Sequence, residues 1–179
     1  MSMEAVHHFI NQFNPNAEET ENWGGLPLRI RSYVIPQLPP LEAITSVRCV
    51  VLREDKVLAM ENPDGWALLP GGRREAEETL LETLHRELLE ESGWTIGEPT
   101  LLGFIHYQHL GEKPTNYTHP YPQFMQVVYT AKALVEYPER RIDDPFEQPA
   151  RFIAVEQAQG LQLHARDRVF LEVALKKSS

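Results

Sequence analysis

The sequence predicts an α/β protein with a mixed β-sheet, preceded by an N-terminal extension. Its 179 residues, 42% of them hydrophobic, suffice for one well-cored domain and an extension but not for two ordinary domains. From residue 45 onward, β-rich runs stand both before and after one strongly amphipathic helical segment. Because a sheet must bury at least one face under a helix, this order predicts helices packed on a mixed sheet.

The predicted extension covers residues 1–44. Residues 3–13 favour a short helix, residues 14–27 have the composition of a loop, and residues 28–35 alternate as in a β-strand. The proline-rich residues 36–42 then predict a stiff connector. We expect the strand to form a sheet edge or to contact a second copy of the chain, so a homodimer is a prediction.

The predicted domain covers residues 45–179 and is built around the helix at residues 75–92, which Gly93 ends. Before it, two β-rich runs flank a turn at Glu54 and Asp55 and predict a hairpin. The predicted strands and the closing helix are, in order, strands 46–55, 56–62, 66–70, 101–110, 123–135 and 151–155, and a helix over 167–176. The long loop 111–122 joins two of these strands.

Composition limits the partners of the protein. A formal net charge of -9 and a pI of about 5.3 argue against nucleic-acid binding, and an anionic substrate would need a local positive feature or a metal ion. We find neither a signal-peptide pattern nor an apolar run of membrane-spanning length, so we expect no membrane partner and a cytoplasmic location. The single cysteine, Cys49, has apolar neighbours that predict an inert buried thiol.

Three glutamates of the predicted central helix crowd one side of it. At 100° per residue Glu87, Glu90 and Glu91 gather beside the apolar stripe rather than opposite it. That stripe consists of Leu80, Leu81, Leu84 and Leu88. Like charges at these spacings repel, whereas a magnesium ion would remove the repulsion and prefers oxygen ligands. A solvated charged face is the alternative, and it fits Glu82 with Arg86, at the favourable i, i+4 spacing, better than it fits the triplet.

The turn before this helix reads Pro70-Gly71-Gly72. Two glycines allow a sharp bend and a close approach of backbone to the helix or to a metal-bound ligand, which a Cβ atom would obstruct. We therefore include Gly71 and Gly72 among the predicted substrate-binding residues. A double glycine by itself is more often an ordinary turn, as we expect for Gly24-Gly25.

Together these positions resemble the Nudix box. The pattern runs over Gly72, Glu78, Arg86-Glu87-Leu88, Glu90-Glu91 and Gly93, and ends on a bulky apolar residue. Trp94 stands where that family usually has an aliphatic residue, which is a mild departure. The resemblance implies a Nudix-like α/β/α sandwich from about Thr45 to the C-terminus.

The resemblance also implies roles for individual residues. Glu87, Glu90 and Glu91 would bind Mg²⁺ or Mn²⁺, and Glu78 with Arg86 is similar to the family's pair that holds the glycine loop and the helix in register. Arg86 has a plainer interpretation, as a surface partner of Glu82. The implied reaction is hydrolysis of a diphosphate linkage, in a nucleoside diphosphate joined to another moiety, by in-line attack of an activated water on phosphorus.

A general base for that water is expected either in the box helix or on a loop before a late strand. Glu147 stands on such a loop and is our candidate for the base or for an additional metal ligand. Asp143 and Asp144 are its rivals, and a solvated loop without chemistry is the structural alternative.

The long loop supplies the candidate substrate-binding residues Tyr117, His119 and Tyr121. Rings and imidazoles near a phosphate site can stack on a base or donate to a phosphate, and long loops in compact domains are commonly functional. Equally, such residues can stiffen and pack the loop.

Two other functions remain on this scaffold. A non-catalytic Nudix-like nucleotide-binding or sensor module would more naturally lack Glu90 or Glu91, and an isomerase finds no support in the sequence. The box itself favours no one nucleotide as substrate.

Overall fold

The computed structural model describes residues 3–62, 65–118, 120–142 and 150–178. Its helices are α1 (Met3–Ile10), α2 (Leu80–Ser92), α3 (Val155–Gly160) and α4 (Ala165–Ser178), with short 3-10 helices η1 (Leu41–Ala43) and η2 (Pro138–Arg140). Its strands are β1 (Ala17–Trp23), β2 (Leu26–Tyr33), β3 (Ile44–Arg53), β4 (Lys56–Asn62), β5 (Gly65–Ala67), β6 (Trp94–Ile96), β7 (Thr100–His109), β8 (Gln123–Glu136) and β9 (Arg151–Ala154).

The strands form one curled mixed sheet. Its order is β1-β2-β7-β8-β3-β4-β5, with β6 paired to β8 and β9 paired to β4. The central pair β3 and β8 is parallel, while the neighbouring pairs are antiparallel. The predicted α/β class with a mixed sheet is therefore confirmed.

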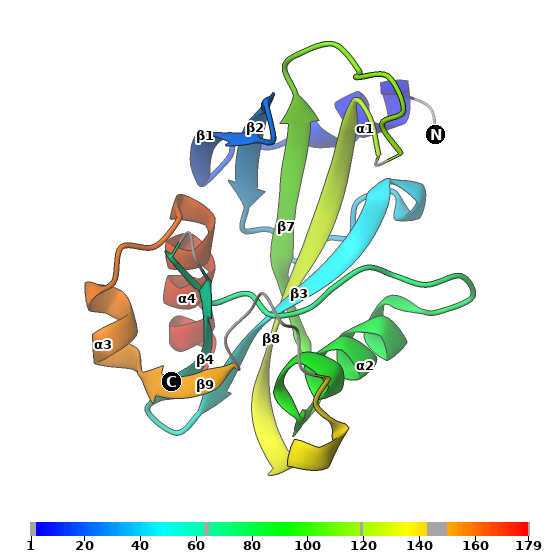
Figure 1. Ribbon diagram of the computed structural model, residues 1–179. Helices are drawn as coiled ribbons and strands as arrows, with labels where there is room; N and C mark the ends of the chain where they lie inside the picture. The colour runs from blue at the N-terminus through cyan, green and yellow to red at the C-terminus, as the bar shows by residue number, and fades with distance from the viewer. Residues whose placement is uncertain (1–2, 63–64, 119, 143–149, 179) are drawn as a thin grey trace.

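Helices cover both sides of the central strands, with α2 on one side of β3, β7 and β8 and α4 on the other (Figure 1). Strand β3 shows the cause, because its side chains alternate between two cores. Val50 and Leu52 pack in the core that includes Phe170 of α4, whereas Cys49 and Val51 pack with the leucines of α2. A strand that helices cover on both faces is apolar almost throughout. The central strands and the helices on their two sides therefore form an α/β/α arrangement.

The N-terminal residues are integrated into this sheet. The predicted strand at residues 28–35 is β2, but it lies between β1 and β7, so the edge position belongs to β1. Residues 17–23 were predicted as loop, and this is wrong, because β1 pairs along its whole length with β2. The turn between them has positive φ at both Gly24 and Gly25, as two-residue hairpins require. Helix α1 packs by Phe9 against Phe104 of β7.

The central helix begins later than the sequence predicts, at Leu80 instead of residue 75. Thr79 caps it by accepting from the amide of Glu82, whose side chain in turn accepts from the amide of Thr79. This reciprocal cap fixes the start of a helix. Gly93 ends it in the left-handed conformation, as predicted. Leu81 is 40% exposed and does not belong to the apolar stripe, which is narrower than predicted.

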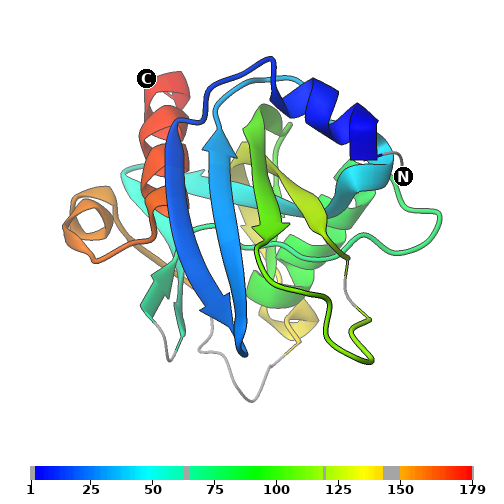
Figure 2. The same ribbon diagram turned by 90° about the horizontal axis from the view of Figure 1, so that it is seen from above.

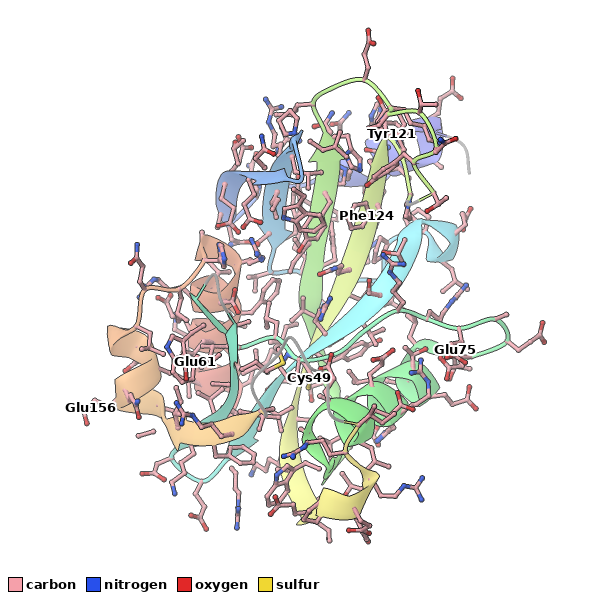
Figure 3. All side chains as sticks on the ribbon, viewed as in Figure 1. Cys49, Glu61, Glu75, Tyr121, Phe124 and Glu156 are labelled. Atoms are coloured by element: carbon pink, nitrogen blue, oxygen red, sulfur yellow. The ribbon has the colours of Figure 1, made fainter. Side chains whose placement is uncertain are left out.

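Two short elements were not predicted, the strand β6 and the helix α3. Cys49 is fully buried near the centre of the molecule, and burial raises the pKa of its thiol, as an inert core residue requires (Figure 3). Within the described ranges, we find no helix that is both long and apolar enough to span a membrane.

Candidate active site

The glycine turn is held between β3 and α2. On the β3 side, the amides of Val47 and Cys49 donate to the carbonyl oxygens of Gly72 and Pro70 at 3.0 and 2.9 Å. On the α2 side, the amide of Gly71 donates to Oε2 of Glu91 at 2.7 Å. The turn is therefore fixed by a strand and by a side chain of the helix that follows it.

Gly72 lets a second carboxylate of the helix approach the turn. A Cβ atom on Gly72 would overlap the carboxylate of Glu87, so the absence of a side chain is what makes room for it. Burial raises the pKa of Glu87, and the nearby Arg86 guanidinium offsets only part of that effect. The carboxylate is thus partly withdrawn from water and lies against the backbone of the turn.

Arg86 is the centre of an ion-pair network. Its Nε donates to Glu78 Oε1 at 2.6 Å, and its Nη1 donates to Glu87 Oε1 at 2.9 Å and to Glu90 Oε2 at 3.1 Å. Its Nη2 donates to the carbonyl oxygen of Arg73 in the turn. The hydrogen bond from Arg86 is the main reason why the pKa of Glu78 falls to about 2.

Arg86 was predicted either to hold the glycine loop and the helix in register with Glu78 or to be a surface partner of Glu82. Glu82 serves as the helix cap, and among the described contacts Arg86 pairs with Glu78, Glu87 and Glu90 instead. The network joins the segment before the helix, the turn and the helix itself. Geometrically, Arg86 and Glu78 hold these three parts together.

The three glutamates of the predicted metal site occupy one side of α2 next to the turn. Glu87 and Glu90 share Nη1 of Arg86, whereas Glu91 points to the Gly71 amide. They are partly buried oxygen donors, and oxygen is the ligand type that a hard divalent cation prefers. The donor set therefore fits magnesium or manganese.

Within the described residues, Glu87, Glu90 and Glu91 are not a group whose ligand atoms all lie within 4.8 Å of one another. Over the described ranges, the three acidic or histidine ligand atoms that all lie within 4.8 Å of one another belong to Glu19, Glu21 and His164. Arg166 forms ion pairs with both of these glutamates. Because these contacts, with the Ala165 amide that donates to Glu19, tie β1 to the start of α4, we assign this group a structural role.

A cavity of about 560 Å³ extends from the box helix across the sheet. Glu91 and Arg48 line it near the glycine turn, where Arg48 Nη1 donates to the carbonyl oxygen of Gly71. Trp23 of β1 and Trp66 of β5 also line it, together with Asp167 of α4. Its volume is typical of a site for a small organic ligand.

The predicted loop residues lie elsewhere. Tyr121 is placed at the end of the molecule where β7 and β8 join the long loop, and its hydroxyl donates to the carbonyl oxygen of Gly111 (Figure 3). The hydroxyl of Tyr117 is 3.2 Å from Nε2 of His109. Neither tyrosine lines the cavity, and His119 and Glu147 lie outside the described residues, as do Asp143 and Asp144.

Sequence reasoning missed most of the cavity. Trp23 stood in a segment predicted as loop, and Arg48, Trp66 and Asp167 stood in predicted elements without a chemical role. Their signals are weak and differ, since Arg48 is a charged residue in an apolar strand whereas Trp23 is a large aromatic residue in a polar segment. Only pairing between distant segments brings them to one place.

The NUDIX domain family model matches residues 43–173. The chain belongs to this family. The resemblance read from the box is therefore confirmed over most of the chain, and the box itself is the segment that carries the carboxylates described above.

Among the Nudix relatives, an uncharacterized Nudix hydrolase, YvcI, of Bacillus subtilis (strain 168) is 37% identical over 68 residues. That match covers 37% of this chain and 42% of the relative, so the chain spans less than half the length of the curated relative it matches.

Solved Nudix structures share the fold at low sequence identity. The pyrophosphohydrolase BsRppH of Bacillus subtilis has a TM-score of 0.55 and 16% identity, over 91% of this chain and 98% of its own. The NUDIX domain of Shewanella oneidensis NrtR, complexed with ADP ribose, has a TM-score of 0.55 and 18% identity, over 76% of this chain and 88% of that domain's chain. A NUDIX hydrolase from Nitrosomonas europaea has a TM-score of 0.50 and 22% identity, over 66% of this chain and 78% of its own.

Proposed function

We propose that this protein is a metal-dependent Nudix-type pyrophosphohydrolase. Its substrate would be a nucleoside diphosphate joined to another moiety, and the bond cleaved would be the diphosphate linkage. The observation that carries the proposal is the position of Glu91, whose carboxylate both accepts from the Gly71 amide and lines the 560 Å³ cavity. One box carboxylate thus adjoins a space large enough for a nucleotide.

Glu87, Glu90 and Glu91 would hold Mg²⁺ or Mn²⁺ in this enzyme. When bound, such an ion neutralises phosphate charge and lowers the pKa of a coordinated water. Arg86 is the residue that keeps Glu87 and Glu90 in place, because one nitrogen of its guanidinium donates to both. Glu78 orients that guanidinium in turn through Nε and Nη2.

Arg48 supplies a positive group close to the box carboxylates. It lines the cavity beside Glu91, and its hydrogen bond to the Gly71 carbonyl fixes its position. A guanidinium is well suited to phosphate oxygens, so Arg48 would bind the diphosphate. For the general base we retain Glu147, which lies outside the described residues, as does His119. Tyr117 and Tyr121 do not line the cavity, so they would contact only a part of the substrate that extends beyond it.

The test is a panel of nucleotide diphosphate compounds, including ADP-ribose, dinucleoside polyphosphates, nucleoside triphosphates, coenzyme A and sugar nucleotides. With Mg²⁺ present, we expect release of a monophosphate product from at least one compound. Glu90→Gln and Glu91→Gln should fold normally and lower kcat by about a hundredfold or more, because each replaces a charged oxygen ligand of the metal ion by a neutral, weaker one.

Glu98→Gln, at an exposed position beyond the helix, is the matched control and should retain full turnover. Unchanged turnover in both Glu90→Gln and Glu91→Gln would exclude the metal assignment. Nucleotide binding without turnover of any compound would favour the non-catalytic binding module instead.

A further inference from the structure

We propose that Trp23 and Trp66 form a subsite for the planar base of the nucleotide, and that the β1–β2 hairpin of the N-terminal residues supplies one wall of it. The inference rests on the proposed function for the position of the diphosphate. Its test is a binding measurement, which does not require turnover.

The two tryptophans come from opposite ends of the strand order. Trp23 is the last residue of β1 and Trp66 lies in β5, yet both line the same cavity. Trp66 forms a backbone bridge with Leu163, and the next residue, His164, places Nδ1 2.9 Å from Oε1 of Glu21. The curl of the sheet and the start of α4 therefore bring both tryptophans into the lining of one cavity.

Both indole rings are held in place by their neighbours. Nε1 of Trp23 donates to Glu21 at 2.8 Å, and its ring packs 5.4 Å from the ring of Tyr107. The guanidinium of Arg151 lies over the ring of Trp66, 5.0 Å from its centroid. Even so, Trp23 is 41% exposed. Fixed, partly exposed aromatic surfaces in a cavity are suited to stacking on a base.

Polar groups in the same cavity favour a base over a purely apolar ring. Asp167 is 2% exposed, and its Oδ1 accepts from the amide of Leu68 at 2.6 Å. Gln126 also lines the cavity, where its Oε1 accepts from Tyr107. An apolar ligand would cover such groups without offering hydrogen bonds, which is unfavourable, whereas the edge of a base can pair with them.

The cavity lining runs from Arg48, beside the box, to Trp23 at the sheet edge, which leaves separate places for a diphosphate and a base. Arg48 lies on β3, Gln126 on β8, Tyr107 on β7 and Trp23 on β1, so the lining crosses the sheet from its centre to its edge. With neighbouring strands about 4.8 Å apart, four steps amount to roughly 19 Å along a flat sheet, and less along a curled one.

The hairpin is fastened to the C-terminal helix and so forms a fixed wall. Glu19 Oε1 accepts from Arg166 Nη1 at 2.6 Å, and Glu19 Oε2 accepts from the amide of Ala165 at 3.1 Å. Glu21 also pairs with Arg166. Helix α4 runs alongside β1 in Figure 2, at the same sheet edge. These contacts hold Trp23 in position from two residues away.

The experiment is isothermal titration of the protein, with Mg²⁺, by α,β-methylene analogues of ADP, GDP, UDP and CDP. Methylenediphosphonate is the base-free control ligand, and neither it nor the analogues can be hydrolysed at the bridging position. The variants are Trp23→Ala and Trp66→Ala, and Tyr137→Ala is the matched control, since Tyr137 is a 41% exposed aromatic residue outside the cavity lining.

We expect at least one nucleotide analogue to bind the wild type more tightly than methylenediphosphonate. Each tryptophan variant should weaken that binding by roughly 5- to 100-fold, as loss of one base-stacking residue does. Affinity for methylenediphosphonate should stay within about twofold, which also shows that the variants are folded.

Two results would overturn the proposal. One is that no nucleotide analogue binds better than methylenediphosphonate, and the other is that both tryptophan variants keep the full preference for the analogue. Absence of hydrolysis across the panel would refute the proposed enzyme and leave a positive titration standing as evidence for the base subsite.

Discussion

The carboxylate of Glu91 accepts a hydrogen bond from the backbone amide of Gly71 at 2.7 Å, across a chain separation of 20 residues. This contact joins the end of α2 to the turn that precedes the helix. Because the same carboxylate lines the cavity, the geometry of the turn and the charge at the cavity wall depend on each other. The neighbouring glycine, Gly72, also meets a carboxylate of α2, because a Cβ atom there would overlap the carboxylate of Glu87.

Replacing Gly72 by alanine should impair activity far more than stability. The new Cβ would overlap the carboxylate of Glu87, the mobile end of a side chain, which can turn away. We expect Gly72→Ala to change the free energy of unfolding in urea by less than about 1 kcal/mol. Turnover of the fastest panel substrate should fall about tenfold or more. Full turnover would mean that the position of Glu87 is unimportant.

Replacing Gly71 by alanine should instead destabilise the fold. Gly71 has φ +127°, and its Cβ would overlap the backbone oxygen of Val47, which cannot turn away. We expect a loss of about 2–4 kcal/mol in the free energy of unfolding. Gly160→Ala is the control, because a Cβ there meets nothing within 4 Å. Equal unfolding midpoints for the two variants would contradict this account.

Removing the cation between Glu19 and Glu21 should loosen the hairpin. Arg166 is 14% exposed and its two partners are 17% and 18% exposed, so Arg166→Met leaves two partly buried carboxylates without their cation. We expect a loss of about 2–4 kcal/mol in the free energy of unfolding and faster amide exchange in β1. Arg168→Met, at an exposed position of the same helix, should have little effect on either measurement.

Stability should fall in mild acid because of His106. This residue is 2% exposed, and burial lowers the pKa of its imidazole to about 4, from an ordinary value of 6.5. The unfolded chain therefore binds the proton first, so the stability present above pH 6.5 falls as the pH falls toward 4. His106 can lower the free energy of unfolding in this way by at most about 3 kcal/mol.

Urea unfolding at several pH values measures this slope. His106→Gln should flatten it, leaving a residual slope from His109, whose pKa is also lowered by burial, and below about pH 4.5 from Glu78, whose pKa Arg86 lowers. His85→Gln, at an exposed helix position, is the control and should keep the wild-type slope. The interpretation fails if His106→Gln retains the whole pH dependence.

The predicted homodimer would have to use a surface other than the backbone of β2. That strand is paired on both sides, and the edge strand β1 carries Glu18, Glu19 and Glu21, which oppose edge-to-edge pairing with a second copy. Light scattering measures the mass in solution. A mass near 20.6 kDa would refute the dimer, and twice that mass would support it.

Much of the fold and of the box could be predicted because the signals are local. Interactions between residues close in the sequence determine three of these features. They are the turn at Glu54, the end of α2 at Gly93 and the spacing of the leucines in α2. The same period places Glu87, Glu90 and Glu91 on one side of the helix. Helix geometry fixes these relationships whatever surrounds them.

Other features had no local signal. Residues 17–23 have too little apolar alternation to predict a strand, yet they form β1, because β2 supplies the hydrogen bonds and Arg166 neutralises the glutamates. Helix α2 starts at Leu80 because Thr79 and Glu82 form a reciprocal N-terminal cap there. The helical sequence pattern, by contrast, extends back to residue 75.

The sequence by itself determined the family, the α/β class and the spacing of the box carboxylates. The tertiary structure alone decided that Trp23 and Trp66 share a cavity with Glu91, and that the hairpin of β1 is fastened to α4. The physical reason is distance along the chain. The contact of Glu19 with Arg166 spans 147 residues, so it exists only once the sheet has curled and both chain ends have packed against it.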